Sequence, residues 1–180
     1  IMEVGIVPAS GSILLANSST NLFVTVFDGP PVTNAVVSAL VEINDSVQSY
    51  FFNNKGDEPD ALADDNVYSN GIDLPRLGGR MKVTYMVEAP EKQPYMRVVH
   101  YDVVPVPEND DYANPYKITG FADVVERINI FATLQPEEMI HAKSPNQVGS
   151  LWWNWSPSTD GKMYADIAGS DVETVIAVYV

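Results

Sequence analysis

The chain has 180 residues, enough for one large domain or two small ones, each with a buried core. Its 24 acidic and 10 basic residues give a net charge of −14, which disfavours nucleic-acid binding because phosphates would be repelled. There is no cysteine, which excludes disulfides, thiolate metal sites and cysteine nucleophiles. No apolar stretch of about 18 residues occurs, so no membrane-spanning helix is expected.

The first part of the chain, residues 1–106, alternates short apolar runs with turn residues. The expected strands are residues 1–7, 22–27, 35–43, 46–52, 80–88 and 96–104. Turn signals recur about every ten residues, a spacing typical of a β-sandwich. The proline-containing run 105–111 is the natural linker to a second domain at 107–180, and the prolines make it stiff.

The loop 53–66 concentrates acidic and amide side chains between expected strands. Calcium takes about six to eight oxygen ligands, which closely spaced carboxylates and amides on a loop can supply. The candidate calcium ligands are Asp57, Asp60, Asp64, Asp65 and Asn66. The alternative is a solvated acidic turn in which an aspartate caps backbone amides. A weaker calcium candidate is the acidic group at 108–111, at the domain junction.

The last thirty residues predict three strands, at 151–155, 163–167 and 174–180, separated by turns. In the first of these strands Leu151, Trp153 and Trp155 share one face, and we expect them in the core. Trp152 points to the other face and is the one ring expected to be exposed. A single ring makes a poor sugar-stacking platform, but Trp152 is the candidate ligand residue if glycans bind.

The final expected strand is almost wholly apolar or β-branched. Its residues are Thr174, Val175, Ile176, Ala177, Val178, Tyr179 and Val180. An exposed edge of this composition invites pairing with another backbone. That backbone would come from more of the same polypeptide, from a separate fragment or from a neighbouring subunit, with residues 1–7 as a candidate donor strand. The abrupt hydrophobic ends favour a segment of a longer polypeptide over a processed mature product.

Four phrases in the second half carry a family resemblance. They are NDDYANP at 109–115, ATLQPEEMIHA at 132–142, SLWWNW at 150–155 and IAGSDVETVIAVYV at 167–180. In this order they resemble a jelly-roll-like β-sandwich module of large secreted bacterial proteins, related to the pre-peptidase C-terminal domains. Gln135 and Met139 depart from the second phrase. The resemblance covers about half of such a module, so it implies that strands are still to be supplied.

The first half resembles an immunoglobulin-like domain of bacterial surface proteins. The matching phrases lie at 31–39, 53–69 and 79–89, and Asn66 stands where that family commonly has glycine. Asparagine tolerates a left-handed backbone, so the turn is expected to survive. Together the two resemblances imply an all-β chain of two tandem β-sandwich units, located outside a bacterial cell or on its surface.

Catalytic signatures are absent from the sequence: there is no nucleophile elbow, zinc-helix motif, P-loop or dinucleotide turn. His100 and His141 are the only histidines and lie far apart, so no multi-histidine metal site is expected. The sequence therefore predicts a non-enzymatic structural or adhesive protein of a bacterial surface assembly, such as a filament or sheath subunit joined by strand complementation. The alternative is an accessory carbohydrate- or substrate-binding module of a secreted hydrolase.

Overall fold

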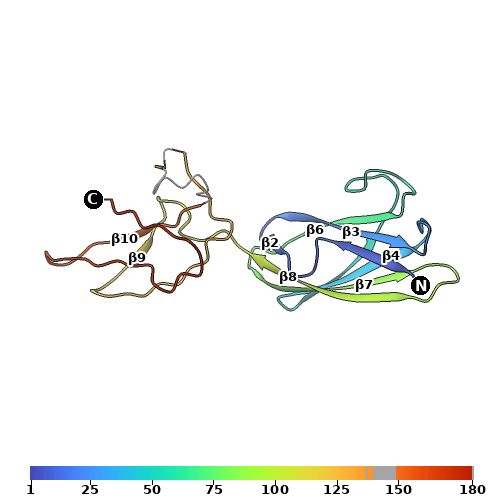
Figure 1. The fold of residues 1–180 in the computed structure, drawn as a ribbon, viewed down its shortest axis with the longest axis horizontal. Coiled ribbons are helices and arrows are strands. Elements are labelled where there is room, and N and C mark those ends of the chain that lie inside the picture. Colours follow the sequence, from blue (N-terminus) through green and yellow to red (C-terminus); the bar gives the residue numbers. More distant parts are fainter. Residues whose placement is uncertain (137, 140–148, 180) are drawn as a thin grey trace. The chain divides into compact units, whose positions relative to one another are not determined.

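The computed structural model describes residues 1–136, 138–139 and 149–179. Within these residues the protein is all-β, with ten strands and no helix, so the expected all-β class is confirmed (Figure 1). The chain divides into two compact units, Ile1–Pro105 and Val106–Val180. The division lies one residue before the boundary expected from the sequence.

The first unit is a sandwich of two sheets. Its strands are β1 (Glu3–Val7), β2 (Ile13–Leu15), β3 (Ser19–Phe27), β4 (Val36–Ile43), β5 (Ser46–Phe52), β6 (Val67–Asp73), β7 (Gly79–Glu88) and β8 (Tyr95–Val104). One sheet has the order β1-β3-β6 and the other β2-β8-β7-β4-β5. The pairs are antiparallel except β2 with β8, which is parallel. β1 is already paired with β3 of this sandwich through five residue pairs. The expected role of residues 1–7 as a free donor strand is therefore wrong.

Alternation along the strands builds the core of the first unit. Val37, Ala39 and Val41 of β4 are buried, whereas the residues between them are half-buried or exposed. Val83 and Tyr85 of β7 pair with Val41 and Ala39, and neither retains any exposed surface. Complete burial of such a side chain stabilises the fold by about 1.5–3 kcal/mol. Every buried apolar side chain among the described residues belongs to this unit.

Two strands of the first unit were not expected from the sequence. β6 contains Ser69, Asn70 and Gly71 and lacks a clear apolar alternation, but seven residue pairs with β3 hold it in register. At Gly71 an added Cβ would lie 3.3 Å from the Asn21 side-chain oxygen, so the glycine permits close approach of β3. β2 has only three residues.

The second unit has little regular structure. Its strands are β9 (Tyr116–Ile118) and β10 (Trp153–Trp155), which pair in parallel with Trp153 opposite Tyr116. The expected strands at 163–167 and 174–180 are wrong for the described residues, because 163–167 and 174–179 belong to no sheet. Strand propensity is largely a fit to cross-strand neighbours, and no strand of the described residues pairs with 163–167 or 174–178. Val180 lies outside the described residues.

Candidate functional site

The carboxylate of Asp60 organises the acidic loop of the first unit. Asp60 is buried, with 4% of its surface exposed. Its two oxygens accept hydrogen bonds from the backbone N–H groups of Gly56 (2.9 Å) and Leu62 (3.3 Å). Gly56 has a positive φ of 74°, and a Cβ there would lie 2.9 Å from the Ala63 nitrogen. Asp60 therefore holds together the two sides of the loop.

The side chains of Asp65 and Asn66 also make hydrogen bonds to the backbone. Asp65 accepts a hydrogen bond from the Val67 backbone N–H at 2.8 Å. The buried Asn66 amide donates to the Val26 carbonyl of β3 at 3.2 Å, which anchors the loop to the sandwich. The φ of Asn66 is 79°, so this residue does adopt the left-handed backbone that the turn requires.

The five calcium candidates do not converge on one point. Asp57 and Asp64 are exposed, while Asp60 is buried against backbone amides. Among the described residues no group of three or more Asp, Glu or His side chains is arranged to hold a metal ion. The geometry matches the alternative of an amide-capped turn. Calcium binding by this loop stays a prediction without a converging ligand set.

Residues of the second acidic group, at 108–111, make hydrogen bonds to distant parts of the second unit. Asp110 accepts hydrogen bonds from the backbone N–H (2.6 Å) and the hydroxyl (2.8 Å) of Thr133. The buried Asn109 side chain donates to the Trp152 carbonyl at 3.0 Å. These bonds join three distant parts of the unit, which gives the NDDYANP phrase a folding role. The partnership with Thr133 had no signal in the sequence.

Trp152 and Trp153 have the opposite exposure from the expectation, whereas Leu151 and Trp155 of the expected core face are half-buried. Trp152 is half-buried beside Tyr112 and Tyr179, with ring centroids 6.0 and 5.6 Å away. Trp153 is 42% exposed, so its expected core position is wrong. Trp155 is half-buried, and its indole N–H donates to the Gly120 carbonyl at 3.0 Å. Backbone bonds from Trp152 to Asn109 and Tyr116 fix this orientation.

Trp152 lines a cavity instead of forming an exposed platform. The cavity has a volume of about 200 Å³. Its lining residues are Tyr112, Gln135, Pro136, Glu138, Met139, Trp152 and Tyr179. Aromatic walls with a few polar groups are typical of small-molecule sites. The sequence singled out Trp152 but gave no sign that Tyr112 and Tyr179 would join it.

The apolar segment 174–180 lies on the surface as far as it is described. Every residue from 156 to 179 is exposed. Val175, Ile176 and Val178 retain 49%, 43% and 62% of their surfaces. Thr174 turns its hydroxyl to the Val172 carbonyl at 3.0 Å. The segment is thus accessible to a partner, although it is not itself a strand.

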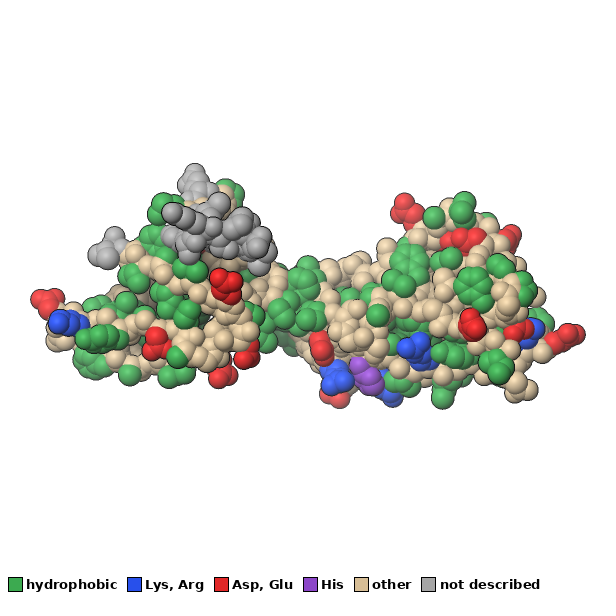
Figure 2. Space-filling view, viewed as in Figure 1, with side chains coloured by type: hydrophobic (Ala, Val, Ile, Leu, Met, Phe, Trp, Pro, Cys, Tyr) green, Lys and Arg blue, Asp and Glu red, His purple; other side chains and the backbone are tan. Residues whose placement is uncertain are grey.

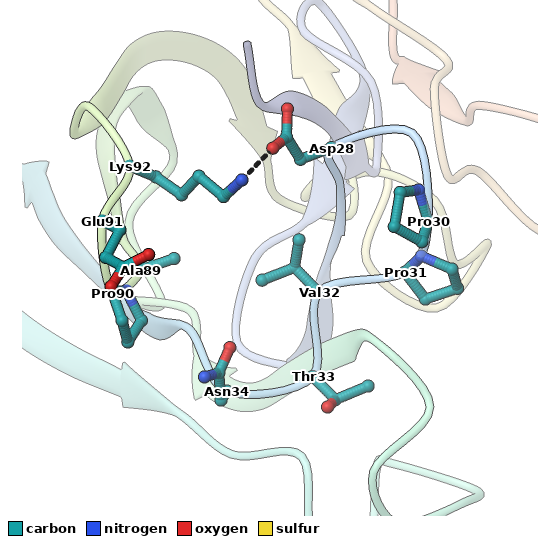
Figure 3. A pocket seen from close by; sticks show the side chains of 10 residues that line it. All are labelled: Asp28, Pro30, Pro31, Val32, Thr33, Asn34, Ala89, Pro90, Glu91 and Lys92. Atoms are coloured by element: carbon teal, nitrogen blue, oxygen red, sulfur yellow. Dashed lines mark hydrogen bonds and ion pairs between the residues drawn. The ribbon is translucent and has the colours of Figure 1, made fainter.

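An open hollow of about 490 Å³ lies on the first unit between the loop after β3 and the loop after β7 (Figure 3). Prolines line both sides, and Lys92 reaches across to form an ion pair with Asp28. The amino group of Ile1 also contacts Asp28, at 2.8 Å. No nucleophile and base are paired there, so the hollow has no catalytic arrangement among the described residues.

The Asp28 ion pair predicts an acid-dependent stability. Hydrogen bonds from Lys92 and the Ile1 amino group lower the pKa of Asp28 from 3.8 to about 2. Because the folded-state pKa is the lower one, this stabilisation is present above pH 3.8 and disappears as the pH falls toward about 2. The melting temperature of the wild type should fall between pH 5 and pH 2, in part because Asp28 is protonated. In Asp28→Asn this contribution is absent, so its melting temperature should fall less over the same range. Asp57→Asn is the control, and an unchanged acid profile for Asp28→Asn would contradict the assignment.

Comparison with known proteins places the chain in no family: no family description and no curated protein matches it. Among solved structures, a glycoside hydrolase-like protein of Bacteroides vulgatus ATCC 8482 is similar at 15% identity and a TM-score of 0.36, over 56% of this chain and 17% of that one. The immunoglobulin-like murine CRIg is similar at 7% identity and a TM-score of 0.34, over 57% of this chain and 98% of that one. Within the residues that the structure describes, no helix is long and apolar enough to cross a membrane. The protein is all-β, with an immunoglobulin-like structure among its neighbours.

Proposed function

We propose that the protein is a non-catalytic structural or adhesive element of a bacterial extracellular assembly, in which strand pairing with another copy completes the second unit. One observation carries this proposal: the described part of that unit buries no apolar side chain. Phe121, Val124 and Ile128 retain 81%, 93% and 63% of their surfaces. Hydrophobic side chains lie on the visible face of the unit in Figure 2.

The energetics favour a partner. Burying one such side chain is worth about 1.5–3 kcal/mol, and monomeric proteins rarely expose large contiguous apolar patches. The segments 163–167 and 174–178 combine strand propensity with backbone groups outside any sheet of the described residues. A strand from a partner satisfies such backbone groups and covers the adjacent apolar side chains at the same time. A head-to-tail contact of this kind propagates into a filament when it does not close on itself.

The test replaces two apolar residues of the terminal segment with charge. Ile176→Lys with Val178→Lys should abolish concentration-dependent assembly, because both side chains would be buried against the added strand. Light scattering over a concentration series gives the mass of wild type and variant. Leu77→Lys is the control, since Leu77 is a 75% exposed apolar residue of the first unit. A wild-type monomer at every concentration would rule out the proposal.

The cavity beside Trp152 favours a second candidate function, an accessory carbohydrate-binding module. Aromatic rings bind the apolar faces of sugars, and Gln135 and Glu138 on the cavity wall offer hydrogen bonds to hydroxyl groups. A glycan screen of the wild-type monomer, repeated on Trp152→Ala, distinguishes the two functions. Binding that disappears in the variant, without any assembly, favours the module.

A further inference from the structure

The outer face of the five-stranded sheet carries an apolar patch. The residues that alternate with the core residues of β4, β5, β7 and β8 point to this face. Six of them are large apolar side chains that keep 38–72% of their surfaces, namely Leu40, Val47, Phe51, Met86, Met96 and Val98. The strand pairs bring these side chains together, because they lie in three successive rows across the sheet. A contiguous exposed apolar patch is typical of an interaction site.

The extent of this face suits a protein partner. β4 pairs through seven residues with each of its neighbours. Four strands about 4.8 Å apart, over seven residues of about 3.4 Å each, give a flat area of roughly 450 Å². Two such faces bury about 900 Å² before the relief of the side chains is counted, close to the roughly 1,000 Å² of the smaller specific interfaces. The face is therefore large enough for a weak dimer.

The strand order allows the face to pack on itself. An axis parallel to the strands and midway between β4 and β7 turns a second copy face to face with the first. It places β7 of the second copy over β4, and β8 of the second copy over β5. Sheets that pack in this aligned way lie about 10 Å apart, with strand directions within about 30° of each other. We propose that two copies of this chain dimerise through these faces about this axis.

The apolar side chains of the two copies meet under this axis. Each row across the sheet faces the same row of the second copy in reverse order. Phe51 faces Met96 of the second copy, so two large apolar side chains are buried together. Ser38 faces Met86 of the second copy, so a small side chain leaves room for a long one. Such alternation of small and large residues lets two sheets interdigitate.

The charges of the face identify the occupant as a second copy. Glu42 and Lys82 form an ion pair at 2.7 Å within one copy. The axis places Glu42 of each copy over Lys82 of the other, so four charges of alternating sign form a closed ring. The chain thus supplies the surface that complements its own charged pair. The remaining charges, Arg80, Glu88 and Asp102, lie at the ends of the face, where interfaces are polar.

This dimer uses the first unit only, so it is independent of the strand pairing proposed for the second unit. A two-fold contact closes at two copies, so growth beyond the dimer belongs to the second unit. The variant Ile176→Lys/Val178→Lys removes that growth and is the background for both tests. Dimers measured in this background report on the sheet face alone, whether or not the second unit assembles.

Phe51→Asp tests the apolar part of the contact. In this background it should weaken dimerisation about tenfold or more, because an aspartate would be buried against Met96 of the second copy. Sedimentation velocity over a concentration series gives the dissociation constant, and circular dichroism verifies the fold. Leu77→Asp adds the same charge at a 75% exposed apolar residue outside the sheet and should change the constant by less than about twofold. A background protein that never dimerises, or equal effects of the two variants, would overturn the proposal.

Charge reversal tests the position of the axis. Lys82→Glu places four carboxylates in the ring and Glu42→Lys places four ammonium groups there, so each variant alone should dimerise about tenfold more weakly. An equimolar mixture of the two variants should restore dimers, because every acidic copy then faces a basic one. A mixture that dimerises no better than its components contradicts the facing of Glu42 and Lys82 and overturns the proposed dimer.

Discussion

Replacement of Tyr85 by alanine is expected to lower the free energy of unfolding of the first unit by about 3–5 kcal/mol, as for other large aromatic residues in cores. Tyr85 has no exposed surface and lies at the centre of the five-stranded sheet. Its ring packs edge-on against Phe52, with centroids 5.9 Å apart. Removal of the ring leaves a cavity between the sheets that a rigid sandwich fills poorly.

Chemical denaturation of the full chain, monitored by circular dichroism, measures this loss. Tyr85→Phe is the matched control, because it keeps the ring and removes only a hydroxyl 3.4 Å from that of Tyr101. Burial raises the pKa of Tyr85 far above its ordinary value, so that hydroxyl is neutral. The control should lose no more than about 1.5 kcal/mol. A Tyr85→Ala variant as stable as Tyr85→Phe would show that the sheets do not pack as described.

The second large effect is expected at Asp60. In Asp60→Ala the backbone N–H groups of Gly56 and Leu62 lose their acceptor. Hydrogen bonds to a charged group are worth about 1.5–3 kcal/mol, and a loss in that range is expected in denaturant titrations. Asp57→Ala, at an exposed position of the same loop, should stay within about 0.5 kcal/mol of wild type.

The same pair of variants tests the calcium prediction. If Asp60 acts only through the two amides, the melting temperature of the wild type is the same with calcium and with chelator. A calcium-dependent rise that disappears in both variants would instead show that the loop carboxylates converge on a cation.

Local sequence pattern was sufficient for most of the first unit. Strands such as Val36–Ile43 and Gly79–Glu88 have a clear alternation, and burial of one face fixes their register. β6 was missed because Asn70 and Gly71 interrupt its pattern, and only pairing with β3 makes it a strand. In the acidic loop, composition indicated calcium, whereas the backbone amides that occupy Asp60 depend on the folded conformation of the loop.

The second unit shows why strand propensity alone was insufficient. The segment 174–178 has the residues of a strand but lies outside every sheet that the described residues form, since a strand requires a neighbouring backbone. The faces of the tryptophans also depend on tertiary contacts. Parallel pairing of Trp153 with Tyr116, together with the bonds of Asn109 to Trp152, sets them. Neither contact is visible in the alternation of residues 151–155.

The most direct test of strand complementation is hydrogen exchange of the backbone amides of residues 163–167 and 174–178, measured by mass spectrometry over a concentration series. We expect rapid exchange in dilute solution, because these residues are exposed and belong to no sheet. At high concentration the same amides should become protected as the measured mass rises, because a partner strand then accepts their hydrogen bonds. Rapid exchange that persists after the mass has risen, or a mass that never rises, would contradict the account.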